Sequence, residues 1–339
     1  MPSFDRTYYY EVVPANHLET ALWLESERML HAKVEEVGIE TQREVVKEER
    51  RQRVDNQPYG SLLEETLKRA YKVHPYRSTV IGSMEHLDAA TEEDYVNFYN
   101  TFYVPNNAIV SIAGNIDYSD ARDLVERYFG DIPRGTRTVP RPDIVEPPLG
   151  GEVRDTIFDN IQLPAVVQTY RIPAQGTDDY YAVQMLAQLL SGGQSARMYK
   201  KLVDEDQLAL QVGSFPLDME DPGLNIVFGI SGLGVDPAQL EAGMDAEVKR
   251  AQTEAIPERE FQKLRNQMEA QFITSNSNVA SIAESLANYE MYFGDANLIN
   301  TELDRYMAVT PADIQRVAKQ YFVPENRVVL YYLPKPENP

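Results

Sequence analysis

The sequence predicts an α+β fold of two homologous domains, each a mostly antiparallel sheet with helices packed on one face. Three observations predict it: the length, an internal duplication, and, in each copy, a capped helix that ends at a Val-Pro pair before a β-rich run. The chain has 339 residues, 43% of them hydrophobic and 25% charged, which is ordinary for a globular protein with a sizeable core. At about 150 residues per domain, this length predicts two domains.

The duplication is clearest near the end of each half. The sequence TFYVPNN at residues 101–107 aligns with QYFVPEN at 320–326. Before these segments, Thr91 and Thr310 can each cap a helix N-terminus, and an aspartate three residues later can complete a capping box. We therefore predict a helix after each threonine.

Both helices are expected to stop at a proline. Pro105 and Pro324 each follow a valine, and proline cannot continue a helix. The runs that follow, from Ala108 to Ala113 and from Arg327 to Leu333, are rich in strand-forming residues. They predict one strand in each copy.

Further predicted elements of the first copy correspond to elements of the second copy in the same alignment. An amphipathic helix follows a proline in each copy, and a highly charged helix comes next. The second copy carries an additional helix and glycine turn. The predicted segments are helices at 18–29, 42–52, 177–190, 237–248 and 258–268, strands at 4–13 and 224–233, and a glycine turn at 191–193.

The domain boundaries follow from this alignment. We expect a first repeat at 1–132, an exposed linker rich in proline and glycine at 133–151, and a second repeat at 152–335. On this alignment the first repeat lacks roughly 70 N-terminal residues that the second one has. The first repeat is therefore expected to be incomplete, with an apolar face and a sheet edge left uncovered.

Composition argues against several classes of function. The 32 basic residues stand against 53 acidic ones, and a net charge of −21 disfavours nucleic acid and anionic membrane surfaces as partners. The absence of cysteine excludes disulfides and thiolate metal sites. No apolar run approaches the ~20 residues of a membrane span, so we expect a soluble protein.

The residues alone leave the chemistry undecided. The four histidines form no H-x-x-E-H or H-E-x-x-H pair, so each is expected to be an ordinary surface or core residue. The charged run at 42–52 is typical of a solvated helix face with ion pairs one turn apart. The segment SGGQS at 191–195 fits either a helix C-terminal turn or a loop that touches substrate, and glycine chemistry by itself favours the turn.

Several segments spread over the chain form a specific combination. They are Thr7-Tyr8-Tyr9-Tyr10, REVVKEERR (43–51), Pro58-Tyr59-Gly60, His74-Pro75-Tyr76, IGSMEHLDAAT (81–91), FYVPNNAIVSIAGN (102–115) and SGGQSARMYKKL (191–202). Together they resemble the pitrilysin/insulinase family of zinc metallopeptidases, the inverzincins. The likeness covers nearly the whole chain and fits the bacterial branch built from two homologous halves, in agreement with the duplication.

The resemblance implies peptide hydrolysis assisted by zinc. In this family an inverted H-x-x-E-H helix supplies two histidine ligands and a glutamate general base, and a downstream glutamate completes the zinc site. The family pattern assigns that downstream metal ligand to Glu49.

The resemblance also implies a peptide or an unfolded polypeptide as substrate, added as an edge strand. The residues that it assigns to substrate binding are Thr7, Tyr9, Ser191, Gly192 and Gly193.

The sequence departs from the family pattern at three places. The H-x-x-E-H motif does not occur, so no catalytic residue is assigned, and zinc is expected in an intact family member and not in this chain alone. The repeat pairs Glu49 with Arg265, a cation. An Arg and Tyr pair that reaches the substrate in many relatives is replaced here by Val203 and Leu210.

We therefore expect a zinc metalloendopeptidase homologue whose truncated chain lacks two zinc ligands and the general base and is inactive alone. The alternative is a non-catalytic subunit that pairs with a homologous, motif-bearing partner. The resemblance allows a periplasmic or a cytoplasmic location.

Overall fold

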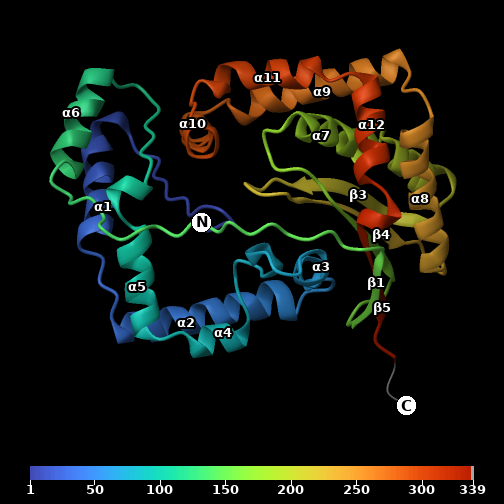
Figure 1. Ribbon diagram of the computed structural model, residues 1–339, viewed down its shortest axis with the longest axis horizontal. Helices are drawn as coiled ribbons and strands as arrows, with labels where there is room; N and C mark the ends of the chain where they lie inside the picture. The colour runs from blue at the N-terminus through green and yellow to red at the C-terminus, as the bar shows by residue number, and fades with distance from the viewer. Residues whose placement is uncertain (337–339) are drawn as a thin grey trace. The chain divides into compact units, whose positions relative to one another are not determined.

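The computed structural model describes residues 1–336, which form helices and one five-stranded sheet (Figure 1). This confirms the predicted α+β class. The chain folds into two compact units. Unit 1 comprises residues 1–52, 80–143 and 273–300, and unit 2 comprises residues 53–79, 144–272 and those from 301 onward.

The sheet belongs to unit 2 and has the strand order β1-β5-β2-β4-β3. Only β1 and β5 run parallel, and the three other pairings are antiparallel, as predicted for the second repeat. The strands are β1 (Val153–Asp159), β2 (Ala165–Arg171), β3 (Ala209–Leu217), β4 (Leu224–Ser231) and β5 (Arg327–Pro334).

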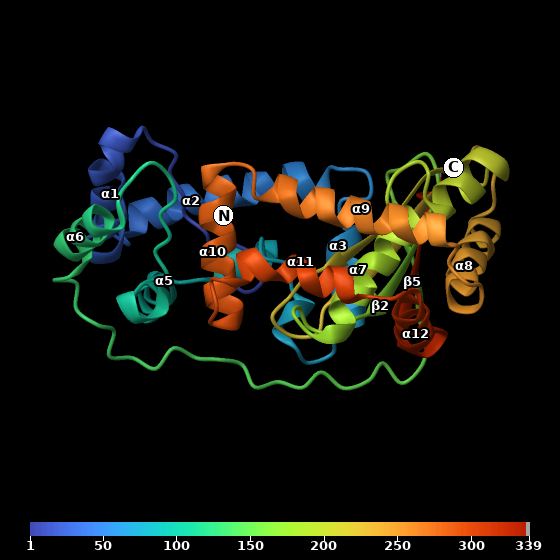
Figure 2. The same cartoon turned by 90° about the horizontal axis from the view of Figure 1, so that it is seen from above.

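Three helices cover one face of this sheet and form the main core (Figure 2). Val166 and Tyr170 of β2 lie on that face, fully buried together with residues of all three helices. Burying such side chains contributes about 1.5–3 kcal/mol each. The helices are α7 (Asp178–Ser191), α8 (Pro237–Thr253) and α12 (Pro311–Tyr321), and unit 2 also contains most of α9 (Glu258–Ser275) and of α11 (Leu298–Ala308).

The opposite face of the sheet is covered as well, by α3 (Leu62–Ala70), which the sequence places in the first repeat. Every residue of β2 from Ala165 to Tyr170 is buried, and successive strand residues point to opposite faces. Leu67 and Tyr71 are buried beside it. Helices therefore cover both faces of this sheet, whereas the sequence predicted helices on one face only.

Unit 1 is helical and buries few apolar side chains. Of its helix α1, only Ala21, Leu22 and Ser26 are buried. The Glu19 carboxylate accepts hydrogen bonds from Arg127 and Tyr128 of α6, at 2.7 and 2.9 Å. Its helices are α1 (Leu18–Leu30), α2 (Glu36–Arg50), α4 (Met84–Ala89), α5 (Glu92–Phe102), α6 (Tyr118–Phe129) and α10 (Val279–Phe293).

The two strands predicted in the first repeat are not formed. Residues 108–113 and 4–13 have no strand assignment apart from an isolated bridge between Pro2 and Thr7. Ile109 and Val110 are 43% and 48% exposed. The matching run in the second copy is β5, which pairs with strands on both sides, and a strand needs such partners for its backbone groups.

The predicted capping boxes are confirmed in both copies. Thr91 caps α5 and Thr310 caps α12, and in each case the aspartate three residues later bonds back to the threonine backbone. Each helix then gives way to a short 3₁₀ turn that begins at the predicted proline. The short turns are η1 (Ala15–His17), η3 (Pro75–Arg77), η4 (Pro105–Asn107) and η6 (Pro324–Asn326), with π-helical turns η2 (Arg51–Asp55) and η5 (Tyr199–Glu205).

Part of the predicted exposed linker is anchored in unit 2. The Glu146 carboxylate accepts hydrogen bonds from the backbone N–H groups of Lys72, Val73 and His74 at 2.7, 3.0 and 2.8 Å. Arg171 donates a fourth bond to it at 3.1 Å. Burial raises the pKa of Glu146, but these bonds outweigh burial, and the net pKa lies below its ordinary value. The segment is therefore exposed over most of its length, as predicted, but Glu146 fixes this end of it to unit 2.

Candidate functional site

The predicted metal ligand, Glu49, lies in the last turn of α2 and is half-buried. Its neighbour Glu48 is exposed and accepts hydrogen bonds from Gln52 at 3.0 Å and Arg51 at 3.2 Å. These bonds hold the pKa of Glu48 below its usual range. Because adjacent helix residues differ by about 100° in direction, the carboxylates of Glu48 and Glu49 point to different sides of α2.

One face of α2 is fixed to the segment that contains α4. Arg43 and Arg50 are buried, and they donate to the carbonyls of Ala90 at 2.8 Å and of Gly82 at 2.6 Å. Lys47 lies between them and pairs with Asp88. The run that the sequence presents as a solvated charged face is therefore partly a docking face within unit 1.

The residues around Glu49 do not fit a zinc ion. A catalytic zinc site needs three protein ligands, usually including histidines. Among residues 1–336, no three His, Cys, Asp or Glu side chains are grouped closely enough to hold a metal. The ligand set that the family pattern assigns to this chain therefore consists of one carboxylate, that of Glu49.

The segment assigned to substrate binding near Thr7 folds back on the N-terminus. The backbone of Tyr8 pairs with that of Met1, where Tyr8 N–H donates to the Met1 carbonyl at 2.9 Å. Thr7 is part of the bridge to Pro2. The backbone that would receive a strand is thus partly engaged within unit 1.

Tyr9 is 40% exposed and is held by aromatic and charged neighbours. Its hydroxyl lies 2.5 Å from that of Tyr103, and the guanidinium of Arg28 lies 4.3 Å from its ring centroid. Burial, together with the hydroxyl of Tyr9, raises the pKa of Tyr103 well above its ordinary value. Tyr9 is therefore partly exposed in unit 1, with its side chain held by Tyr103 and Arg28.

The glycine loop after α7 has the geometry of a helix C-terminal turn. Gly192 N–H donates to the Gln188 carbonyl at 2.7 Å, and Gly193 has a φ of 93°. A Cβ on Gly192 would lie 2.5 Å from Gln188. Both glycines are thus required by the turn, which is the interpretation that glycine chemistry favoured.

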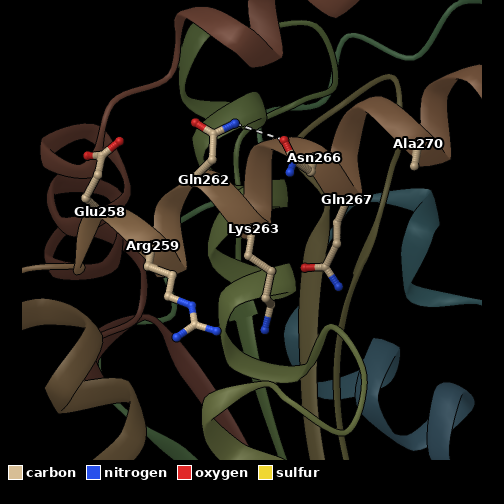
Figure 3. Close-up of a pocket in the computed structure, with 7 residues that line it drawn as sticks. All are labelled: Glu258, Arg259, Gln262, Lys263, Asn266, Gln267 and Ala270. Atoms are coloured by element: carbon tan, nitrogen blue, oxygen red, sulfur yellow. Dashed lines mark hydrogen bonds between the residues drawn. The ribbon is translucent and has the colours of Figure 1, made fainter.

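The helix α9 holds this loop from one side. Lys263 donates to Ser195 Oγ at 2.9 Å, and Gln267 donates to the Gly192 carbonyl at 3.2 Å. One turn earlier, Glu260 forms a bidentate pair with buried Arg197, at 3.1 and 2.7 Å. Figure 3 shows the side chains of Lys263 and Gln267 pointing to the same side of α9, along a shallow pocket lined by residues of this helix.

The three residues at which the sequence departs from the family pattern all lie in unit 2. Val203 in η5 packs against the core of unit 2, and Leu210 is 59% exposed in β3. Arg265 is half-buried in α9, with its Nε buried and without a hydrogen-bond partner in the part of the chain that the structure describes.

Sequence reasoning missed the pairing of a buried histidine, His74, with the aspartate Asp221 in unit 2. His74 is 4% exposed, its Nδ1 accepts from the Tyr76 backbone, and its Nε2 lies 3.1 Å from the Asp221 carboxylate. Because Nδ1 accepts, Nε2 carries the proton and donates to Asp221. The partners are 147 residues apart, so no local signal could have joined them.

Comparison with known proteins places these features in a family. The family described as Peptidase M16 inactive domain matches residues 89–268, which is more than half of the chain. A zinc protease from Helicobacter pylori, PqqE, is 28% identical over 334 residues, covering 98% of this chain and 75% of its own length.

No helix within residues 1–336 has the length and apolar character needed to cross a membrane.

Solved structures agree with the fold. The crystal structure of a protease from Helicobacter pylori superposes with a TM-score of 0.90 at 26% identity, over 95% of this chain and 78% of that one. A peptidase M16 inactive domain from Pseudomonas fluorescens has the same fold, with a TM-score of 0.81 at 16% identity, over 95% of this chain and 76% of that one. The chain therefore belongs to the M16, or pitrilysin, family of zinc peptidases and their homologues.

Proposed function

We propose that this chain is a zinc metalloendopeptidase homologue that does not hydrolyse peptides by itself. The observation that carries the proposal is the donor set: Glu49 is the one ligand that the family pattern assigns, and the sequence contains no H-x-x-E-H. Zinc lowers the pKa of its bound water only when it is held, and one carboxylate does not hold it at useful affinity.

The roles assigned to Glu49 and to the substrate-binding residues belong to this proposal. Glu49 is the glutamate that would complete a zinc site whose histidines come from other polypeptide. Thr7 and Tyr9 would contact substrate in unit 1, and the loop at 191–193 would contact it in unit 2. The exposed ring of Tyr9 supports the first of these roles.

The test is zinc content measured together with peptidase activity. Elemental analysis of the purified chain, dialysed against micromolar zinc, is expected to give far less than one zinc per chain. A quenched fluorescent peptide is expected to show no turnover sensitive to a chelator. Stoichiometric zinc with chelator-sensitive turnover would refute the proposal.

A matched pair of variants locates the ligand. In a preparation where a motif-bearing homologue restores activity, Glu49→Gln is expected to abolish turnover, because it removes a ligand. Glu48→Gln, one residue away and exposed, is expected to leave turnover unchanged. Equal losses in both variants would contradict the assignment of Glu49.

The second candidate is a non-catalytic subunit that pairs with a homologous, motif-bearing partner. Large apolar side chains exposed in unit 1 favour it: Trp23 is 48%, Leu24 45% and Phe98 55% exposed. The unpaired run at 108–113 offers backbone groups that a partner strand could bond. A separate gene for a motif-bearing homologue that copurifies with this chain would support it, whereas an H-x-x-E-H encoded upstream in the same reading frame would exclude it.

A further inference from the structure

Residues 1–13 form an arm, the N-terminal arm, that lies against helices of unit 1. The arm contains no helix, and its one bridge joins two of its own residues. Arg6 donates to Glu284 of α10 at 2.5 Å, and the Tyr9 hydroxyl lies 2.5 Å from that of Tyr103, the residue that ends α5. Side chains therefore hold the arm to these helices, and no ladder of backbone bonds does so in the described residues.

Glu11 attaches the arm to α1 through a second acidic side chain. Its carboxyl group hydrogen-bonds to that of Glu25. Glu25 also accepts from Nε and Nη2 of Arg28, at 3.0 and 2.9 Å, whereas Glu11 lies 4.0 Å from Arg28 Nη2. One cation thus stands beside two acidic groups, and Glu25 takes its closest bonds.

A hydrogen bond between two carboxyl groups needs a proton on one of them, because an ionised carboxylate only accepts. Burial raises the pKa of Glu11 to about 7, and the hydrogen bond and the charge of Glu25 act in the same direction. Burial also raises the pKa of Glu25, but the bonds from Arg28 and Glu11 outweigh it, and the net pKa lies below its ordinary value. The proton therefore lies on Glu11, and Glu25 is the ionised partner of Arg28.

The other titratable groups around this pair are tyrosines of the arm and of α5. The ring of Tyr9 lies 4.3 Å from the Arg28 guanidinium, and the Tyr99 hydroxyl donates to the Arg28 carbonyl at 2.7 Å. Burial raises the pKa of Tyr99 and of Tyr103, so both stay neutral where Glu11 titrates. The charges that act on Glu11 are those of Glu25 and Arg28.

We propose that Glu11 is a pH-sensitive switch, which holds the N-terminal arm on α1 while it shares a proton with Glu25 and releases the arm when that proton is lost. Two ionised carboxylates would then repel each other beside one arginine, which balances only one of them. The arm carries Thr7 and Tyr9, so the regulatory role of the switch rests on the proposed function, which assigns these residues to substrate.

The direction of the pH effect follows from the same contacts. In a released arm Glu11 has the ordinary pKa of about 4.3, so the docked arm binds the proton more tightly. Docking is therefore strongest in acid and weakens as the pH rises through the docked value of about 7. A difference of more than two pKa units changes the docking equilibrium constant on the order of 100-fold between the two limits.

The experiment follows the arm by fluorescence anisotropy. The chain has no cysteine, so Val12→Cys, at a side chain that is 67% exposed, accepts one pH-insensitive maleimide dye. The anisotropy is expected to fall as the pH rises, with a midpoint near 7. In the labelled chain, Glu11→Gln is expected to keep the high value at every pH, because an amide donates without titrating. Glu25→Gln is expected to move the midpoint toward acid, because it removes the like charge and frees Arg28 for Glu11.

The controls change neighbouring groups outside the pair. Glu27→Gln removes a carboxylate of α1 that bonds to His31 at 2.8 Å, and it is expected to leave the step and its midpoint unchanged. His17→Gln and His31→Gln are also expected to keep the step, although histidines ordinarily titrate in this range. In the unmodified chain with ¹³C-labelled glutamate, the carboxyl signal that Glu11→Gln removes is expected to titrate near pH 7.

Four results would each overturn the proposal: an anisotropy independent of pH, a step that persists in Glu11→Gln, a step that either histidine substitution abolishes, or titration of Glu11 near its ordinary pKa. None of these measurements uses zinc or a peptide substrate. Failure of the switch is therefore distinguishable from failure of the proposed function, which the zinc and peptidase assays test.

Discussion

Glu146→Gln tests how strongly the linker is anchored to unit 2. Oε1 of Glu146 accepts from Lys72 and Arg171, and Oε2 accepts from Val73 and His74. Replacing Oε2 by an NH₂ group turns two of these bonds into donor–donor contacts. Hydrogen bonds to a charged group are worth about 1.5–3 kcal/mol each, so we expect a loss of about 3 kcal/mol in the free energy of unfolding.

The assay is thermal unfolding followed by circular dichroism at pH 7. For domains of about 150–250 residues, 1 kcal/mol corresponds to about 2–4 °C in Tm, so the expected decrease is about 6–12 °C. Glu325→Gln, at an exposed position in η6, is the control and is expected to change Tm by less than about 2 °C.

The pH dependence of this difference has a fixed sign. The pKa of Glu146 is lowered in the folded protein, so its contribution is complete above the unfolded pKa of about 4.3 and disappears as the pH falls through the folded value. The gap in Tm between the variant and the unmodified chain should therefore close in acid. A decrease no larger than that of the control, or a gap that widens in acid, would refute this account of the anchor.

Two other substitutions test local and buried polar structure in unit 2. Thr310→Ala removes the cap of α12 and is expected to cost about 1 kcal/mol in urea unfolding, and an unchanged midpoint would contradict the capping box. Arg327→Met leaves the carboxylates of Glu152 and Asp245, each 2.6 Å from the guanidinium, without this partner. Because both carboxylates are partly exposed, we expect the free energy of unfolding to fall by about 2–3 kcal/mol, less than the 3–5 kcal/mol typical of fully buried pairs. A fall below about 1 kcal/mol would show that solvent screens these ion pairs.

The elements that could be predicted from the sequence are those that depend on residues close together in the chain. The caps at Thr91 and Thr310, the proline stops, and the strand from Arg327 onward all depend on residues within a few positions of one another, and the structure has them. The glycine turn after α7 was predictable for the same reason. The repeat boundaries at 1–132, 133–151 and 152–335 remain a prediction.

The features that the sequence did not predict depend on distant partners. The run at 108–113 has strand-forming residues, but these form a strand only where another strand pairs with them. The bond between Ser191 and Ser214 joins a helix end to a sheet edge, and His74 meets Asp221 across 147 residues. For the candidate site, motif matching names Glu49 and also shows that H-x-x-E-H does not occur. The structure adds that among residues 1–336 no three His, Cys, Asp or Glu side chains are grouped closely enough to hold a metal.

The placement of α3 means that the predicted repeat boundary and the boundaries of the compact units fall at different points of the chain. The predicted boundaries place residues 53–79 in the first repeat, yet these residues belong to unit 2, where Leu67 and Tyr71 are buried. A protein cut inside 133–151 would not yield two self-sufficient halves, because the C-terminal piece would expose the β2 and β5 side chains that α3 normally keeps from water. Residues that the predicted boundaries assign to the first repeat therefore help to bury the sheet of unit 2.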